Sequence, residues 1–310
     1  MEHAVKKLLI WFTLPLLLLA PLAAWAGTFT WIPPHGALPT EAACLATILS
    51  GGNSTATEGV SGNTPYNSTV IPKWDLANFY ANGNGAAGTV VPNTYYSNVS
   101  GDLPTLMYAQ NGTVPTTDET IDFYACKWGL DPDVYRAEAW EESTWNAETL
   151  GDLHTVLAEC TQPTYNFFAL WNGTNCHESE GIIQQKVFYY IYEHPWDLMS
   201  TSFALDVRGA IARGAINGDM SAYFTNNGTD NPAAGHNHYL TDVGNCSLGT
   251  SSYCTDLYDG AIATWFSGAW WDGTSNGATG CLTTGSTGAV GYWYDCVNPF
   301  VSSKPWPGGL

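Results

Sequence analysis

All eight cysteines of this 310-residue chain lie after residue 26, and the segment before them has the pattern of a secretory signal. The segment begins with Lys6 and Lys7, continues with an apolar run over residues 8–19, and closes on Ala24-Trp25-Ala26. Because this run is shorter than the ~20 residues that a spanning helix needs, an uncleaved membrane anchor is the less favoured alternative. We expect cleavage after Ala26 and a secreted protein, extracellular or periplasmic, with no membrane partner.

An even number of cysteines in an exported chain predicts a disulfide framework, here of four bonds. Eight cysteines allow on the order of 100 pairings, so the sequence does not fix the connectivity. Pairs close in sequence are favoured, which leaves one long-range pair: Cys160–Cys176, Cys246–Cys254, Cys281–Cys296 and Cys44–Cys126. Zinc is the competing interpretation, but the sequence has no C-x-x-C pair or Cys/His cluster with ligand spacing. We expect neither a metal nor a cofactor.

The charge of the chain restricts its partners. Nine Lys and Arg residues stand against 28 Asp and Glu residues, which gives a formal net charge of −19. The predicted signal holds Glu2, Lys6 and Lys7, a net +1, so its removal leaves −20. An acidic surface repels phosphate backbones and anionic lipids, which argues against nucleic acid as a partner. The 14 Trp and 17 Tyr residues can supply core packing or flat platforms for sugar rings.

The region 27–116 is predicted to be irregular and to wrap around the remainder of the chain. Gly, Asn, Thr, Ser and Pro recur every few residues there, and helical periodicity is weak. One short helix over 74–80 and short strands at Thr89-Val90-Val91 and Leu106-Met107-Tyr108 are the expected exceptions.

From residue 117 the pattern becomes helical. Apolar residues at helical spacing predict a helix that ends at Gly129, and Asp131 with Pro132 marks the start of a second helix over 132–145. These two helices should form a hairpin. Further helices are predicted over 182–193, 200–216 and 255–266, with a long loop at 150–180 and a Gly- and Thr-rich tail from 272. The expected fold class is mainly α (α+β), with one domain over 117–310.

Short motifs follow one another in a fixed order along this domain. They are Asp122-Phe123-Tyr124-Ala125-Cys126-Lys127-Trp128-Gly129-Leu130-Asp131, Tyr135-Arg136-Ala137-Glu138-Ala139-Trp140-Glu141-Glu142-Ser143, Gly151-Asp152, Gly181-Ile182-Ile183-Gln184-Gln185-Lys186, Ser200-Thr201-Ser202-Phe203, Trp265-Phe266-Ser267-Gly268-Ala269-Trp270 and Lys304-Pro305-Trp306. The ordered set resembles the catalytic region of secreted lytic transglycosylase-like proteins of the lysozyme superfamily. This resemblance implies a lysozyme-like helical domain.

The resemblance also implies cleavage of the β-1,4 glycosidic bond of peptidoglycan by a single catalytic acid, Glu142. That carboxyl must be protonated near neutral pH, and the flanking residues Trp140 and Trp145 could desolvate it enough. The implied neighbours are Ser143, which positions Glu142, and Gln184, which binds substrate. Trp265 and Trp270 are expected to stack on sugar rings.

Plainer interpretations exist for several of these residues. Glu141 points about 100° away from Glu142 on a helix and is the neighbour most easily confused with it. Asp152 is either a second carboxylate or part of a Gly-Asp turn. Trp270, with Trp271, is as readily a core residue as a platform. His236-Asn237-His238 has the spacing of a metal-binding pair, but in a Gly/Asn loop it is more often incidental.

The chain also departs from the family pattern. The segment between Glu142 and Gln184 is long and carries an extra cysteine pair, and Ala204 stands where the family tends to have Asn. Trp265-Phe266 replaces a Tyr-Asn pair that many transglycosylases carry. Two other functions therefore stay open. One is hydrolysis of a chitin- or chitosan-like polymer, which the acidic charge would favour by steering. The other is a catalytically inactive extracellular sugar-binding or surface-assembly protein on the same fold. The oligomeric state is not indicated.

Overall fold

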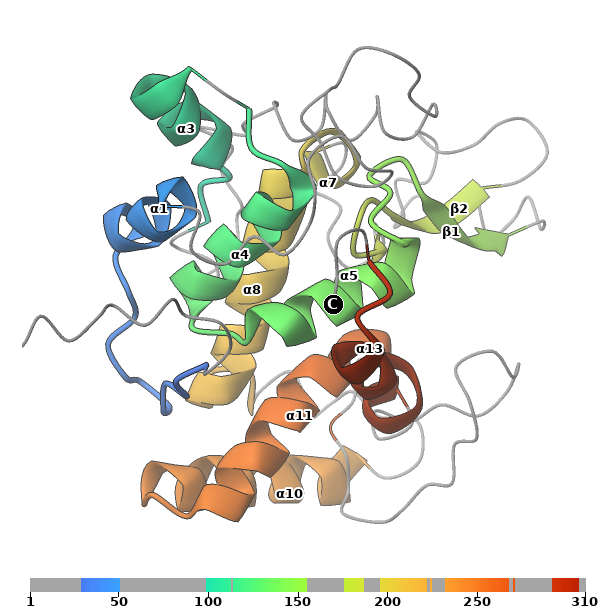
Figure 1. The fold of residues 1–310 in the computed structure, drawn as a ribbon. Helices are drawn as coiled ribbons and strands as arrows, with labels where there is room; N and C mark the ends of the chain where they lie inside the picture. The colour runs from blue at the N-terminus through green and yellow to red at the C-terminus, as the bar shows by residue number, and fades with distance from the viewer. Residues whose placement is uncertain are drawn as a thin grey trace, which may run out of the picture.

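The helical hairpin predicted around Gly129 lies at the centre of the computed structural model (Figure 1). The structure describes residues 29–50, 99–112, 114–154, 176–186, 196–221, 224, 232–267, 270 and 292–306. Most of these residues are helical, and a single three-stranded sheet accounts for the strands among them. The prediction of a mainly α fold is thus confirmed. The predicted signal, residues 1–26, lies outside the described residues.

Strong capping signals explain why the hairpin was predictable. Helix α4 (Thr117–Trp128) begins with a capping box, in which Thr116 and Glu119 bind each other's backbone N–H, and ends at Gly129 with φ 63°. Helix α5 (Pro132–Ser143) begins at Asp131, whose side chain accepts a hydrogen bond from Asp133 N. It ends two residues earlier than predicted, because Thr144 and Trp145 both adopt left-handed conformations.

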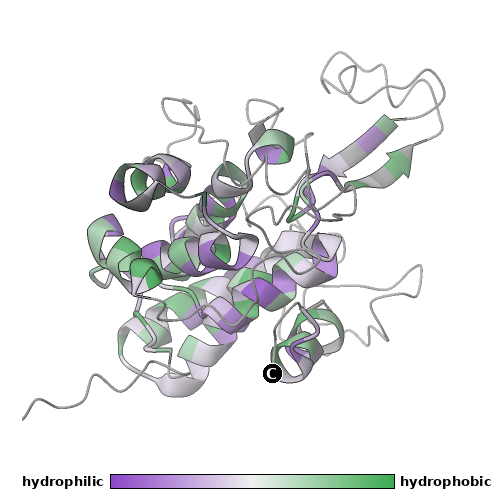
Figure 2. Cartoon of the chain, turned by 45° about the horizontal axis from the view of Figure 1, so that its top comes forward, coloured by the Kyte–Doolittle hydropathy of each residue, from purple (hydrophilic) through white to green (hydrophobic). Residues whose placement is uncertain are grey.

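The long helix α8 (Thr201–Asn217) packs against α4, and residues 201–216 of it are all buried. Ser200 caps its N-terminus and Gly218, with φ 90°, ends it, so that the helix matches the predicted range 200–216 within one residue at each end. Buried charge accompanies this packing: Asp206 of α8 accepts hydrogen bonds from Lys127 and Trp128 of α4. In Figure 2 the helices at the centre of the bundle carry purple, hydrophilic segments as well as green ones.

The N-terminal region is more helical than predicted. Helix α1 (Glu41–Leu49) and helix α3 (Leu103–Asn111) both lie within residues 27–116, and they contribute Leu45, Ile48, Leu103 and Met107 to the core. The predicted strand Leu106-Met107-Tyr108 is wrong, because these residues lie in α3. The predicted helix at 74–80 and the predicted strand at Thr89-Val90-Val91 lie outside the described residues.

The sheet lies where a loop and a helix were predicted. Strands β1 (Leu150–His154), β2 (Cys176–Glu180) and β3 (Gln185–Lys186) pair antiparallel in the order β1-β2-β3. The predicted loop over 150–180 is therefore wrong at both of its ends. The predicted helix over 182–193 is wrong at its start, because residues 181–184 form the turn between β2 and β3.

The C-terminal part adds helices around α5 and α8. They are α7 (Trp196–Met199), α10 (Pro232–Ser247), α11 (Ser251–Ser267), a π-helical turn (Tyr292–Val297) and α13 (Asn298–Ser303). Helix α11 confirms the prediction over 255–266 but begins four residues earlier, at Ser251. Helix α10 was not predicted. Within the described ranges, each helix is too short or too polar to cross a bilayer.

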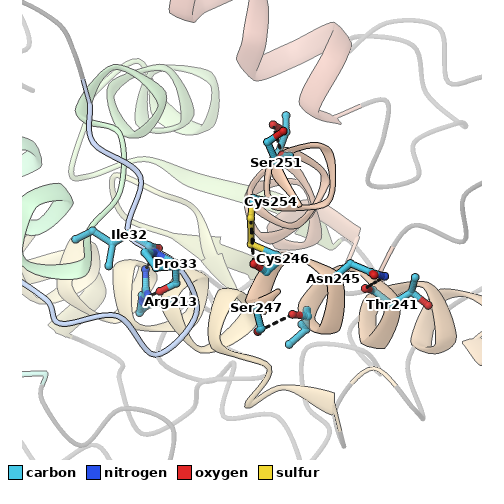
Figure 3. Close-up of a disulfide and its surroundings, with 11 residues drawn as sticks. Ile32, Pro33, Arg213, Thr241, Asn245, Cys246, Ser247, Ser251 and Cys254 are labelled. Atoms are coloured by element: carbon cyan, nitrogen blue, oxygen red, sulfur yellow. Dashed lines mark hydrogen bonds between the residues drawn. A yellow bond between two sulfur atoms is a disulfide. The ribbon is translucent and has the colours of Figure 1, made fainter. Parts of the chain in front are cut away.

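Two predicted disulfides are confirmed. Cys44–Cys126 ties α1 to α4, and Cys246–Cys254 ties α10 to α11 (Figure 3). Cys176 and Cys296 are also disulfide-bonded. Their predicted partners, Cys160 and Cys281, lie outside the described residues, so these two pairings stay predictions.

Candidate active site

Glu142 lies on the last turn of α5 and is half-buried. The helix stops one residue later, where Thr144 turns the chain with φ 54°. Trp145 follows, and its buried indole donates a hydrogen bond from Nε1 back to Arg136 O at 3.1 Å. The C-terminal end of α5 is thereby folded back on its own helix, which fixes the backbone that carries Glu142.

Ser143 joins this end of α5 to the turn at 181–184. Its buried Oγ donates a hydrogen bond to Ile182 O at 2.6 Å and accepts one from Asn146 N at 3.1 Å. The residue next to Glu142 thus contacts the turn directly, although Ser143 and Ile182 are 39 positions apart in the sequence. The expectation that Ser143 positions Glu142 stays a prediction.

The turn itself is held by Gln184. Its Nε2 donates to Thr149 O at 3.0 Å and to Gly181 O at 2.9 Å, and its Oε1 accepts from Ser179 Oγ at 3.3 Å. Gln184 has φ 51° and Gly181 has φ 81°, so the turn takes two left-handed residues. Each of these side-chain hydrogen bonds serves the hairpin. The predicted contact of Gln184 with substrate stays a prediction.

Gly151 leaves the space that the Gln184 amide occupies. A Cβ atom at this position would lie 2.0 Å from Gln184 Oε1 and 2.8 Å from Ser179 Oγ. Because real Cβ atoms do not approach other atoms so closely, a larger residue would displace the amide. This close approach explains why the Gly151-Asp152 motif has glycine at its first position. The backbone of Asp152 lies in β1 rather than in a turn.

Trp265 lies on α11 beside the same turn. Its Nε1 donates a hydrogen bond to Ile183 O at 2.9 Å, and the Arg208 guanidinium carbon lies 4.8 Å from its ring centroid. The ring is half-buried. The structure therefore brings Trp265 together with Ser143 around two successive carbonyl groups, those of Ile182 and Ile183.

The prediction that Trp270 stacks on substrate is wrong. Its side chain is 6% exposed, and it packs against the rings of Phe224 and Tyr239 at centroid distances of 5.3 and 4.6 Å. Its Nε1 donates to Asp242 Oδ2 at 3.2 Å. A large aromatic ring gains more from burial in the core than from exposure, so Trp270 is a core residue.

Glu141 shares the half-buried environment of Glu142. Burial raises the pKa of the Glu141 carboxyl above its ordinary value. A raised pKa is what a general acid needs, so Glu141 is the alternative donor that an experiment must test beside Glu142.

Sequence reasoning missed a buried ion pair one helical turn before Glu142. Glu138 on α5 and Arg208 on α8 are both fully buried, and Glu138 Oε1 accepts from Arg208 Nε at 2.8 Å and from Nη2 at 2.6 Å. Burial raises the pKa of Glu138, and Arg208 opposes that shift. One signal was available in the sequence. In a chain with only nine basic residues, an arginine inside the apolar helix α8 points to a buried acidic partner.

A second cluster surrounds the start of α5. Arg136 binds Asp118 at 2.6 Å, Asp133 at 3.0 Å and also Asp122. Burial raises the pKa of Asp122 and Arg136 opposes that shift. These charges are paired within the fold and fix α5 to α4.

The histidine pair predicted as an incidental metal-binding candidate lies on α10 rather than in a loop. His236 Nε2 lies 2.8 Å from Ser221 Oγ, whereas His238 Nδ1 lies 3.2 Å from Asp242 Oδ2. Residues two apart on a helix point about 200° apart, so the two rings have different partners. Over the described ranges, no three His, Cys, Asp or Glu side chains gather as a metal site would require.

Three segments meet at the turn 181–184: α5 through Ser143, α11 through Trp265, and the residue before β1, Thr149, through the amide of Gln184. Neither a family model, nor a curated protein, nor a solved structure matches this chain.

Proposed function

We propose that this protein is an exported lytic transglycosylase-like enzyme with a lysozyme-like domain, which cleaves β-1,4 glycosidic bonds in a peptidoglycan-like polysaccharide. Glu142 is its catalytic acid. One observation carries the proposal: the Ser143 Oγ hydrogen bond to Ile182 O at 2.6 Å. That bond seats the helix end bearing Glu142 on the Gly-Ile-Ile-Gln turn, which is the pairing that the sequence resemblance implies.

A half-buried carboxyl at a helix end suits the first chemical step. The protonated Glu142 gives its proton to the glycosidic oxygen as the bond from that oxygen to the anomeric carbon breaks. The carboxylate that results then accepts the proton of the sugar's own 6-hydroxyl, whose oxygen attacks the anomeric carbon. The products are a new chain end with a hydroxyl group and a 1,6-anhydro end. The proton returns to Glu142, and no second carboxylate is needed, unlike in the paired-acid hydrolases.

The partially buried Trp265 supports a sugar substrate. It stands beside the turn and is only partly buried as a residue, and an aromatic face can pack on the apolar face of a pyranose. The disulfides Cys44–Cys126 and Cys246–Cys254 support an oxidising compartment. The net charge of −19 supports an uncharged or cationic polymer over a nucleic acid.

The test is a digestion of purified peptidoglycan by the protein without residues 1–26, followed by mass analysis of the released ends. We expect anhydro ends from the wild-type protein and none from Glu142→Gln. Glu141→Gln is the matched variant, and it should retain activity. If Glu141→Gln alone abolishes release, the acid has been misassigned to Glu142.

Other outcomes separate the alternatives. Reducing ends would identify a hydrolase, and a parallel digestion of chitosan would test that polymer. Binding without release would identify a sugar-binding protein and contradict the enzymatic proposal. The variant Ser143→Ala tests the hydrogen bond between Ser143 Oγ and Ile182 O. Ser247→Ala is the control, because exposed Ser247 makes a similar hydrogen bond to Val243 O at 2.7 Å on α10. Only Ser143→Ala should lower release.

A further inference from the structure

A closed ring of contacts begins and ends on α5, on either side of Glu142. It starts at Glu138, crosses to Arg208 on α8, continues to Trp265 on α11, and reaches the turn at Ile183 O. From the adjoining carbonyl of Ile182 it returns to α5 through Ser143. Residues 138–143 are the α5 segment that the ring spans, and Glu142 lies within it.

Arg208 is the member of the ring that joins α5 to α11, through Glu138 on one side and Trp265 on the other. Its guanidinium binds Glu138 Oε1 through two nitrogens, at 2.8 and 2.6 Å. Its Nη2 also lies 3.3 Å from Ile262 O on α11, three residues before Trp265. The guanidinium carbon lies over the Trp265 ring, 4.8 Å from the centroid, within cation–π range. A lysine ammonium can replace the charge but not the planar fork.

We propose that Arg208 is a positioning residue that holds Trp265, and through Trp265 the turn 181–184, against the Glu142 end of α5. Arg208 is fully buried, so its effect on the site is exerted through the residues that it contacts. It orients the indole, so that Nε1 meets Ile183 O while Ser143 Oγ meets Ile182 O. The kinetic part of this inference rests on the proposed function, because it supposes that Glu142 acts on substrate beside the turn.

The first test reads the geometry without any substrate. The variant Arg208→Lys keeps the positive charge beside Glu138. Its effect is measured on the indole N–H signal of Trp265 by nuclear magnetic resonance. The signal is assigned by its absence from the spectrum of Trp265→Phe. Lys127→Gln is the matched control, because Lys127 forms a buried ion pair with Asp206 of the same helix α8 and lies outside the ring. We expect the Trp265 signal to shift in Arg208→Lys and to stay in place in Lys127→Gln. An unmoved signal in Arg208→Lys overturns the proposal.

The second test measures turnover of peptidoglycan. A small misplacement of a reacting group can lower a rate by about 100-fold, and we expect Arg208→Lys to lower kcat about 10- to 100-fold with a smaller effect on KM. Because Arg208 acts through Trp265, the kcat of the double variant Arg208→Lys/Trp265→Phe should be no lower than that of the less active single variant. Additive losses, or an equal loss of kcat in Lys127→Gln, would reduce Arg208 to a stabilising role and overturn the proposal.

The two tests also distinguish this inference from the proposed function. A wild-type protein that releases no fragments from peptidoglycan or chitosan contradicts the proposed function. The indole signal still decides then whether Arg208 holds Trp265 at the turn.

Discussion

Burial changes the protonation of several single carboxyl groups in this protein. Burial, reinforced by the neighbouring carboxylate of Asp256, raises the pKa of Asp259 from 3.8 to about 7, while a hydrogen bond from Trp293 opposes the shift. Burial likewise raises the pKa of Asp242 to about 6, although His238 opposes it. Both residues lie on the pair of helices α10 and α11. The acid-base behaviour of this pair therefore differs from that of ordinary surface carboxylates.

Asp259→Asn is expected to change how stability depends on pH. The folded protein holds a proton on Asp259 up to about pH 7, whereas the unfolded chain releases it near pH 3.8. Since the folded state binds more protons in this window, stability falls as pH rises through it, by at most about 1.4 kcal/mol per pH unit. The variant lacks this contribution to the slope. Urea unfolding at pH 4, 5.5 and 7.5 should show that the free energy of unfolding of the variant rises relative to that of the wild type as pH rises. A constant difference across the three values would contradict the assigned pKa.

At the scale of elements, the candidate site depends on a hairpin built around one side chain. The Gln184 amide bonds to backbone or side-chain groups of Thr149, Ser179 and Gly181, and so ties the turn to the residue that precedes β1. Gly151 makes room for that amide. The position of the turn that contacts Ser143 and Trp265 therefore depends on the stability of this short sheet.

Gly151→Ala is expected to displace the Gln184 amide, because the new Cβ would lie 2.0 Å from Gln184 Oε1. Overpacking of this kind destabilises by about 1–3 kcal/mol, and release of glycan fragments should fall with it. Gly244→Ala is the matched control, because no atom lies within 4 Å of a Cβ there and the residue sits on α10. That change should stabilise by about 0.5–1 kcal/mol. Denaturant unfolding of both variants checks the pair, and equal effects would contradict the packing argument.

The elements that could be predicted from the sequence are those with local start and stop signals. Asp131 with Pro132 marked α5, because capping acts between near neighbours in the chain, and α8 likewise has a local cap at Ser200 and a local stop at Gly218. The strands β1 and β2 have no such local signal. Leu150 of β1 pairs with Glu180 of β2, so these strands are stabilised by contacts between residues far apart in the sequence. A local pattern of residues does not reveal such contacts. Helix α10 was missed because its Gly, Asn and His residues are weak helix formers, and packing on α11 with the Cys246–Cys254 bond supports it instead.

The candidate site could be predicted in part for the same reason. Ser143 and the turn were found as motifs, and their contact follows from the fold. The roles of the tryptophans could not be read from sequence, since whether a ring is buried depends on partners elsewhere in the chain. Trp265 meets Arg208 and Ile183, whereas Trp270 meets Phe224 and Tyr239 in the core.

Over the whole molecule, the C-terminal segment returns to the helix that carries Glu142. Helix α13 packs against α5, and Lys304 forms an ion pair with Asp133 at 3.1 Å near the start of α5. Trp306 is 2% exposed and stacks on Trp145, with ring centroids 6.1 Å apart and planes 18° apart. The last described residue of the chain thus packs on the segment that directly follows Glu142.

Trp306→Ala is expected to lower the free energy of unfolding by about 3–5 kcal/mol, as removal of a large buried aromatic side chain does. The buried Trp306 Nε1 has no hydrogen-bond partner in the described part of the chain, so Trp306→Phe loses no such bond and should destabilise far less. Lys304→Ala removes only a partly exposed ion pair, which contributes at most about 1 kcal/mol. Urea unfolding followed by tryptophan fluorescence ranks the three variants. If Lys304→Ala were as destabilising as Trp306→Ala, charge rather than aromatic packing would hold the C-terminal segment to α5.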